Sequence, residues 1–306
     1  MAIRYYREVK SVSKVSTGKG YELELPTSYI AMQEEAERTI SELVAKKPKA
    51  QRMWELLRSD PEAKANWDMS NYIAVSKLKY NDHGEIHAKI VAANALQMLK
   101  FLFDSGIATS TMREKAGDED DVYLIVLTGA LLHDIGNQVH RENHHIAGVY
   151  LAIPLLNRLL PKIYKNEEVM FEVRGHILHC VYSHEFDVQD LTEEAALVGI
   201  ADGTDMTKGR GRMAFDKGNV NIHTVSALSI EKVEVKQGKD VPIQILIHMN
   251  NSAGVFQIQE TLGKKIIGGP LENYCEVIAV AKPDEPQADQ RIVHRIIIKG
   301  KRMQAL

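Results

Sequence analysis

Cysteine is scarce in this chain of 306 residues, which contains only Cys180 and Cys275. Two cysteines this far apart form no disulfide framework, and they lack the close spacing of the pairs that build thiolate zinc knuckles. Any metal site in this protein must therefore use nitrogen and oxygen ligands, supplied by histidine, aspartate or glutamate side chains.

The chain also lacks long apolar runs and an excess of positive charge. No apolar run approaches the roughly 18 residues of a membrane span, and the start MAIRYYREVK has no apolar signal-peptide core. We therefore expect a cytoplasmic protein that does not enter a membrane. The net charge of -3 leaves no footprint for nucleic acid, although a small anionic substrate could still use local basic residues.

The length and the 44% hydrophobic content predict one large domain and one small one. Residues 1–79 are expected to form a short hairpin and amphipathic helices that pack on the domain after them. Residues 80–215 show helical patterns, and we expect an all-α bundle there. Helices are predicted at about 143–161, 166–183 and 192–206.

Residues 220–306 have a different pattern, which predicts a separate α+β domain. Apolar residues alternate from Val241 to Met249, return to helical spacing from Val255 to Leu262, and form strand-like runs at 273–281 and 291–299. The order is ββαββ, and a ferredoxin-like sandwich is the simplest arrangement for it. Formation of a homodimer through the edge of this sheet is a hypothesis.

Histidine is concentrated in one part of the chain. Nine of the twelve histidines fall between positions 83 and 184, where an even spread would place about four. They lie on four helix-like segments: His83 and His87; His133 beside Asp134; His140, His144 and His145; and His176, His179 and His184. Asp202 lies on a fifth. Helices that face one another can bring such groups together around a divalent metal and leave room for water and substrate.

The pair His133-Asp134 closes the run VYLIVLTGALLHDIG, which is apolar almost throughout. This run predicts a buried central helix that ends at Gly136, a residue that commonly caps helices. A His-Asp dipeptide by itself is common. Its significance comes from His87 before it and Asp202 after it.

This ordered set resembles the signature of the HD superfamily of metal-dependent phosphohydrolases. The matches are His87 in HAKIVAANAL, His133 and Asp134 in LLHDIGN, and Asp202 in GIADGTDMTKGR, and the resemblance covers about residues 80–212. It implies an all-α HD-type bundle in which these four residues bind one or two divalent ions. Mn, Mg, Fe, Co, Ni and Zn are all open as the metal.

Superfamily members that hold two metals have further histidines, and the resemblance extends to these. His144 in HHIAG and His184 in CVYSHE match such positions, but Ser183 stands where the first histidine of a pair is expected. His179 is a candidate to replace that histidine, and His83 lies where some members have a carboxylate for the second metal. His83, His140, His145 and His179 stay open between ligands, groups that orient ligands, substrate contacts and surface residues, whereas His176 is expected to be structural.

The resemblance implies an enzyme that hydrolyses a phosphoester, most simply that of a nucleotide. Asp134 would ligate or bridge the metals and hold the attacking hydroxide, with His133 beside it in the catalytic centre. Hydrolysis also needs cations around the phosphate, and Arg141 and Lys208 are the candidates. A basic cluster beside glycines, such as DMTKGRGR, is equally typical of a solvated loop.

Two other classes of function remain open. HD-type di-iron oxygenases resemble the hydrolases in their ligands and differ mainly in their iron and their substrate. A regulatory module that binds metal or nucleotide, with the C-terminal region as sensor, is the other alternative. The intact series of ligands argues against a degenerate metal site.

Overall fold

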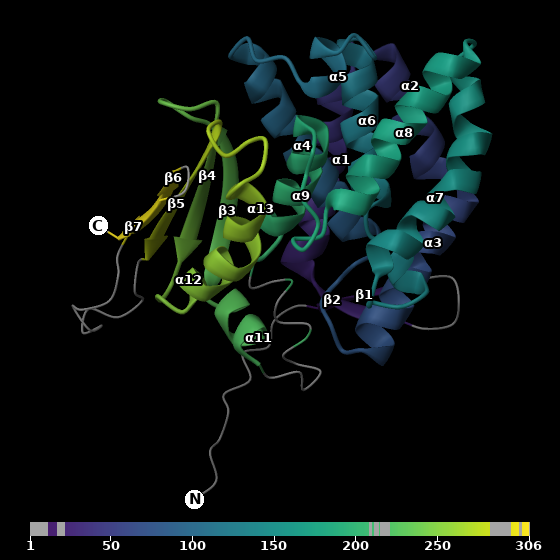
Figure 1. Cartoon of the computed structure of the whole chain (residues 1–306). Helices are drawn as coiled ribbons and strands as arrows, with labels where there is room; N and C mark the ends of the chain where they lie inside the picture. Colours follow the sequence, from purple (N-terminus) through teal and green to yellow (C-terminus); the bar gives the residue numbers. More distant parts are fainter. Residues whose placement is uncertain are drawn as a thin grey trace, which may run out of the picture.

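The computed structural model describes residues 12–16, 22–207, 210, 214, 221–281, 295–299 and 302–305. A helical body makes up most of the described chain, and a smaller region with a β-sheet lies at its side (Figure 1). The protein is therefore mainly α, as the sequence predicted. The proposed boundaries at 79, 215 and 220 stay predictions.

The helical body begins with a hairpin and then contains most of the helices. The antiparallel strands are β1 (Val12–Ser16) and β2 (Glu22–Pro26). The α-helices are α1 (Thr27–Val44), α2 (Pro48–Ser59), α3 (Pro61–Asn71), α4 (Glu85–Asp104), α5 (Ser110–Arg113), α6 (Glu119–Leu132), α7 (His144–Leu159), α8 (Glu167–Ser183) and α9 (Glu193–Thr204). Short π or 3-10 segments are η1 (Tyr72–Lys77), η2 (Ile135–Gln138) and η3 (Leu160–Lys162). Helices α7, α8 and α9 start and end within a few residues of the predicted ranges.

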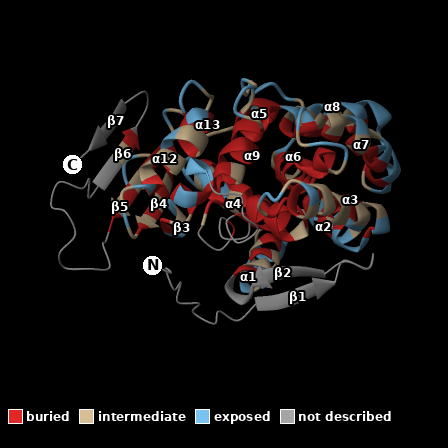
Figure 2. Cartoon of the chain, turned by 90° about the horizontal axis from the view of Figure 1, so that it is seen from below, coloured by how far each residue is buried: buried red, intermediate tan, exposed pale blue. Residues whose placement is uncertain are grey.

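The helix α6 lies at the centre of the body. It begins with a capping box between Asp118 and Asp121, and all of its residues from Asp121 to Leu132 are buried. It packs against α2, α4, α8 and α9. Figure 2 shows that buried residues are concentrated in α4, α6 and α9. The predicted buried central helix is therefore present.

The end of α6 differs from the prediction. The helix stops at Leu132, before His133, and Gly136 lies in the following 3-10 turn η2. Gly136 is required there by close packing, because a Cβ atom would lie 1.8 Å from the backbone oxygen of His144 and 2.5 Å from the backbone nitrogen of Gly148. This contact places the start of α7 directly beside the His-Asp pair.

The helices before residue 80 also support this turn. The indole nitrogen of Trp67 on α3 donates to the backbone oxygen of Leu131 at 2.8 Å, and the Ser70 hydroxyl donates to the backbone oxygen of Asp134 at 3.2 Å. Carbonyl groups at a helix end lack partners within the helix, so these side chains satisfy them.

The smaller region contains a five-stranded sheet in the order β3-β4-β5-β6-β7. Its elements are α11 (Ile222–Ala227), β3 (Ile230–Gln237), β4 (Ile243–Met249), α12 (Gly254–Gln257), η4 (Ile258–Gly263), α13 (Lys264–Ile266), β5 (Cys275–Ala281), β6 (Arg295–Lys299) and β7 (Arg302–Ala305). The predicted order ββαββ is present, with β7 added. Among the strands that the structure describes, β4 and β5 alone pair in parallel.

The hypothesis of a ferredoxin-like sandwich is wrong. That fold has two β-α-β units, whereas the described strands lie in sequence order with a single helical crossover, between β4 and β5. Alternating apolar residues predicted the strands correctly, because Ile243, Ile245 and Ile247 all point into the core. Alternation carries no information about which strands become neighbours.

The small region rests on the helical body in two places: α13 and η4 pack on α9, and β3 and β4 lie beside α4. Within the described part of the chain, no helix has both the length and the apolar character needed to cross a membrane.

Replacement of Gly136 by alanine tests the close contact between η2 and α7. We expect Gly136→Ala to lower the free energy of unfolding by about 1–3 kcal/mol, because the new methyl group collides with the backbone of α7. Gly175→Ala on α8 is the matched control. No atom lies within 4 Å of its added Cβ, so helix propensity should stabilise this variant by up to about 1 kcal/mol. Urea unfolding of the two variants measures both changes, and equal stabilities would contradict the packing argument.

Candidate metal centre

Histidine and aspartate side chains from five segments meet inside the helical body. They are His87 on α4, His133 and Asp134 after α6, His144 at the start of α7, His184 after α8 and Asp202 on α9. The first five are at most 5% exposed, and the side chain of Asp202 is 21% exposed. All six were candidate metal ligands from the sequence.

One group of possible ligand atoms comes from His87, His133 and Asp134, and these atoms lie within 4.8 Å of one another. The Nε2 atom of His87 lies 3.3 Å from Oδ2 of Asp134 and 3.2 Å from Nε2 of His133. Oδ1 of Asp202 lies 3.1 Å from the same His87 nitrogen. Two imidazoles and two carboxylates therefore converge at this point.

A second group comes from Asp134, His144 and His184, again within 4.8 Å. The Nε2 atoms of His144 and His184 are 2.9 Å apart, and Oδ1 of Asp134 lies 3.3 Å from His144 Nε2. Asp134 thus presents Oδ2 to the first group and Oδ1 to the second. A carboxylate in this position can bridge two metal ions.

The four imidazoles are held with Nε2 toward the centre by contacts to their Nδ1 atoms. The partners of Nδ1 are Asp205 Oδ2 for His87 (2.7 Å), Ala130 O for His133 (2.7 Å), Val181 O for His184 (2.7 Å) and Arg141 O for His144 (3.1 Å). An oxygen at Nδ1 favours the tautomer that leaves the Nε2 lone pair free. This pattern is typical of histidines that bind metals.

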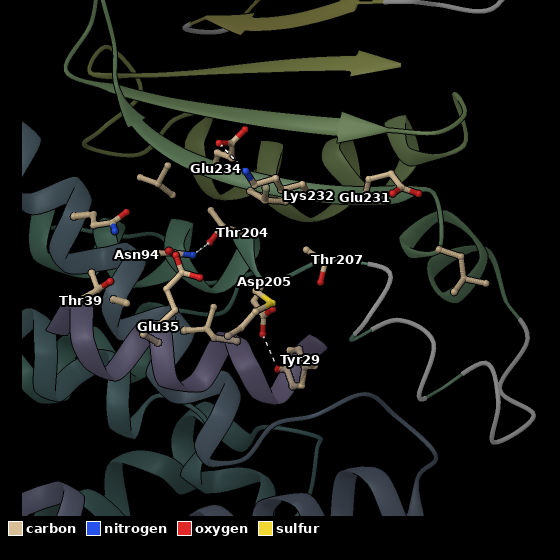
Figure 3. A pocket seen from close by; sticks show the side chains of 18 of the residues that line it. Tyr29, Glu35, Thr39, Asn94, Thr204, Asp205, Thr207, Glu231, Lys232 and Glu234 are labelled. Carbon is tan, nitrogen blue, oxygen red and sulfur yellow. Dashed lines mark hydrogen bonds and ion pairs between the residues drawn. The ribbon is translucent and has the colours of Figure 1, made fainter. Parts of the chain in front are cut away.

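Asp205, which orients His87, is itself fixed from the side away from the centre. The Tyr29 hydroxyl on α1 lies 3.1 Å from Asp205 Oδ2, and the Arg210 guanidinium donates to the backbone oxygen of Asp205 at 2.8 Å. Figure 3 shows Tyr29 and Asp205 on the wall of a cavity of about 860 Å³ between α1, α4 and β3. None of the four clustered imidazoles lines this cavity.

The charges of the cluster favour a bound cation. Burial lowers the pKa of His87, but hydrogen bonds to three surrounding aspartates outweigh burial and raise its pKa to about 10. Burial also lowers the pKa of His133, but Asp134 and Asp202 together outweigh burial and raise it. In contrast, burial and the neighbouring His133 and His144 hold the pKa of His184 well below its usual value. The carboxylate-rich first group thus attracts positive charge, and the imidazole of His184 stays neutral.

These donors fit a divalent metal. Each group supplies imidazole nitrogens and a carboxylate oxygen, a set that suits borderline and hard first-row ions. The residues that would hold metal are His87, His133, Asp134 and Asp202 on one side, and Asp134, His144 and His184 on the other. The donor set does not identify the metal.

A cavity of about 540 Å³ opens onto this cluster, and Asp134 and Asp202 form part of its wall. Arg141 also lines it, with its Nη1 atom 3.8 Å from Asp134 Oδ1, so this predicted cation does lie beside the centre. Glu185 lies 3.5 Å from His144 and adds a carboxylate that the sequence did not single out. The other predicted cation, Lys208, lies outside the described residues.

The remaining histidine candidates do not join either group. His83 lines the cavity, its ring centroid is 5.9 Å from that of His87, and its Nδ1 contacts the backbone oxygen of Asn81 at 2.8 Å. The structure does not bring His179 to the centre, since it contacts Ser183 and the backbone nitrogen of Leu191. It precedes His184 by five residues, a rotation of about 140° around the helix.

Besides Glu185, the sequence did not identify two further residues of the site, Asp205 and Lys265. Asp205 follows Asp202 by three positions, so helical spacing could have identified it as a neighbour of the same face. Lys265 lies in the C-terminal region, yet its Nζ atom is 2.5 Å from Asp202 Oδ2. No local pattern connects it with the histidines.

Comparison with known proteins agrees with this geometry. The family model described as HD domain matches residues 85–207. The chain is 49% identical over 218 residues to the uncharacterized protein MJ1020 of Methanocaldococcus jannaschii, and this match covers 71% of the chain and 84% of that protein. No solved structure matches the chain.

Two histidines on the same helix segment give a matched test of the ligand set. We expect His184→Ala to lose binding of at least one divalent ion, because His184 Nε2 belongs to the second group. His179→Ala should bind the same number of ions as the wild-type chain. Calorimetric titration with Mn²⁺ and Co²⁺ and elemental analysis measure the stoichiometry. Loss of metal from the His179 variant would contradict the assignment.

The role of Asp205 is tested without removal of a ligand. We expect Asp205→Ala to weaken metal binding by about 10–100-fold, because His87 loses the carboxylate that holds its ring and tautomer. Tyr29→Phe removes the hydroxyl that contacts Asp82 and Asp205 but leaves the Asp205 carboxylate at His87, so it should have a smaller effect. Metal affinities of both variants from calorimetry decide this order, and a larger loss in Tyr29→Phe would contradict it.

Proposed function

We propose, because this chain belongs to the HD superfamily of metal-dependent phosphohydrolases, that it hydrolyses a phosphoester with a metal-activated water. The observation that carries the proposal is the shared carboxylate of Asp134, which offers one oxygen to each group of histidines. A site of this kind suits two ions that act together on an attacking water and a phosphoryl group. The oxygen and nitrogen donors of the cluster also suit the divalent ions that such hydrolysis requires.

The metal supplies Lewis acidity, which lowers the pKa of water and stabilises charge on phosphoryl oxygens. The protein holds the groups that surround this reaction. Asn137 donates to Asp134 Oδ1 at 2.7 Å and thereby fixes the carboxylate at the cavity wall. Asp134 can then accept a hydrogen bond from the attacking water and orient it toward a phosphate in the cavity.

Arg141 is the best-placed cation for the phosphate. Its guanidinium lines the cavity with the side chain 32% exposed, and its Nη1 atom contacts Asn137 Oδ1 at 3.3 Å and His144 Nε2 at 3.1 Å. Guanidinium groups form paired hydrogen bonds with phosphate oxygens. Arg210, in contrast, is committed to the backbone oxygens of Asp82 and Asp205 and serves the scaffold.

The cavity also supports a substrate with an organic group the size of a nucleoside. Its volume of about 540 Å³ falls in the range of small-molecule sites. Its wall includes aromatic rings and amides that could pack on and bond to a base: Tyr80, Asn81, Phe186, His223 and Gln257. We therefore propose a nucleotide phosphoester as the substrate class.

The hydrolase proposal is tested with a panel of nucleotides and other phosphoesters in the presence of Mn²⁺, Mg²⁺, Co²⁺ or Fe²⁺. We expect phosphate release by the wild-type chain and a loss of at least about 100-fold in Asp134→Ala, because this variant lacks the shared ligand. The His179→Ala variant should keep the wild-type rate. Turnover is measured by release of inorganic phosphate or nucleoside.

Two outcomes would contradict the proposal. Absence of product across the panel and all metals would favour a regulatory module, if the chain retains affinity for a nucleotide. Two irons per chain together with oxygen consumption would favour an HD-type oxygenase.

A further inference from the structure

Lys265 is a residue of the C-terminal region whose ammonium group reaches the metal centre. It lies on the short helix α13, it is 9% exposed, and its Nζ atom is 2.5 Å from Asp202 Oδ2. The same ammonium donates to the backbone oxygen of His184 at 2.9 Å. A buried ammonium is costly unless it is paired, and both of its contacts lie at the centre.

The lysine leaves the ligand oxygen of Asp202 available. Lys265 binds Oδ2, whereas Oδ1 faces the imidazole of His87 at 3.1 Å and that of His133 at 3.8 Å. The ammonium therefore does not take the place of a metal ion. It fixes the rotation of the carboxylate so that Oδ1 points to the first group.

The same contact spans the two groups of ligands. Asp202 lies beside the first group on α9, and His184 is a member of the second group after α8. The Lys265 ammonium joins the carboxylate of Asp202 to the backbone oxygen of His184. The two groups are thus linked by a residue that neither helix supplies.

Close packing brings Lys265 to this position. A Cβ atom on Gly203 would lie 3.1 Å from Cδ1 of Leu262 and 3.5 Å from Cδ of Lys265, so α9 passes η4 and α13 at short distance. Leu262 is fully buried in this contact. The C-terminal region is therefore docked on α9 at the turn of helix that carries Asp202.

We propose that Lys265 is a positioning residue through which the C-terminal region completes the metal centre. The proposal rests on the proposed function only in that both require the cluster to bind divalent metal. Lys265 orients Asp202, ties it to the end of α8, and so sets the affinity and the geometry of bound ions. The centre belongs to both regions of the chain.

The test compares Lys265→Met and Lys265→Arg in the full chain. We expect Lys265→Met to bind Co²⁺ about 10–100-fold more weakly than the wild-type chain and to change the visible absorption of the bound Co²⁺. Lys265→Arg keeps the positive charge, so it should retain at least part of the wild-type Co²⁺ affinity and absorption spectrum. Lys236→Met is the control, because Lys236 lies in the same region, pairs with Glu234 on β3 and is remote from the centre.

A second comparison separates positioning from general damage. In Asp202→Asn, the partner of Lys265 is already neutral, so adding Lys265→Met should change Co²⁺ affinity by less than about twofold. This double variant leaves no unpaired buried charge at the contact, so it also serves if Lys265→Met alone does not fold. Circular dichroism of the metal-free proteins checks folding.

The result that overturns the proposal is a folded Lys265→Met variant with wild-type Co²⁺ affinity and spectrum. A raised KM with unchanged metal affinity would also overturn it, since that pattern belongs to a direct substrate contact. Absence of phosphate release from a wild-type chain whose metal affinity does depend on Lys265 would refute the hydrolase alone. A wild-type chain that binds no divalent ion would refute both.

Discussion

The buried carboxylate of Asp134 is the constraint on which the rest of the structure depends. It lies between two pairs of imidazoles, and removing a carboxylate from water costs several kcal/mol unless charge and hydrogen bonds compensate. Imidazoles from α4, from α7 and from the residues that follow α6 and α8 supply this compensation, whereas Asp202 on α9 adds a second carboxylate. The histidine-bearing segments thus converge around the buried charge of Asp134.

The supporting contacts extend well beyond the helices that carry ligands. Tyr29 on α1 contacts both Asp82 and Asp205, and Asp82 in turn accepts a hydrogen bond from the backbone nitrogen of His87 at 2.9 Å. The network of Tyr29, Asp82 and Asp205 therefore holds both the Nδ1 atom of the His87 ring and the backbone at the start of α4. Because each member is buried and bonded, a displaced ring would leave polar groups unpaired. The N-terminal helix thus contributes to the rigidity of a centre that it does not enter.

The sequence predicted much of this fold and site, because the relevant signals are local. The apolar run identified α6, and the order of His87, His133, Asp134 and Asp202 identified the first group. The prediction that His179 replaces the histidine missing at position 183 depended on the rotation of α8 around its axis, which the sequence pattern did not fix. Lys265 was missed because its contact with Asp202 spans 63 positions and arises from docking of the C-terminal region on α9. The order of strands likewise depends on tertiary pairing, which alternation does not encode.

The two regions of the chain contribute different residues to the site. The helical body supplies all six candidate ligands, whereas α11 and η4 supply residues such as His223 and Thr261 to the cavity wall above them. The helical body therefore supplies the candidate ligands, and both regions of the chain form the wall of the cavity. Asp205 lines both this cavity and the larger one beside β3, and its carboxylate contacts His87 Nδ1. The Asp205 side chain therefore lies between His87 and the cavity that β3 borders. A shift of the sheet region would change the outer support of the metal centre and the wall of its cavity together.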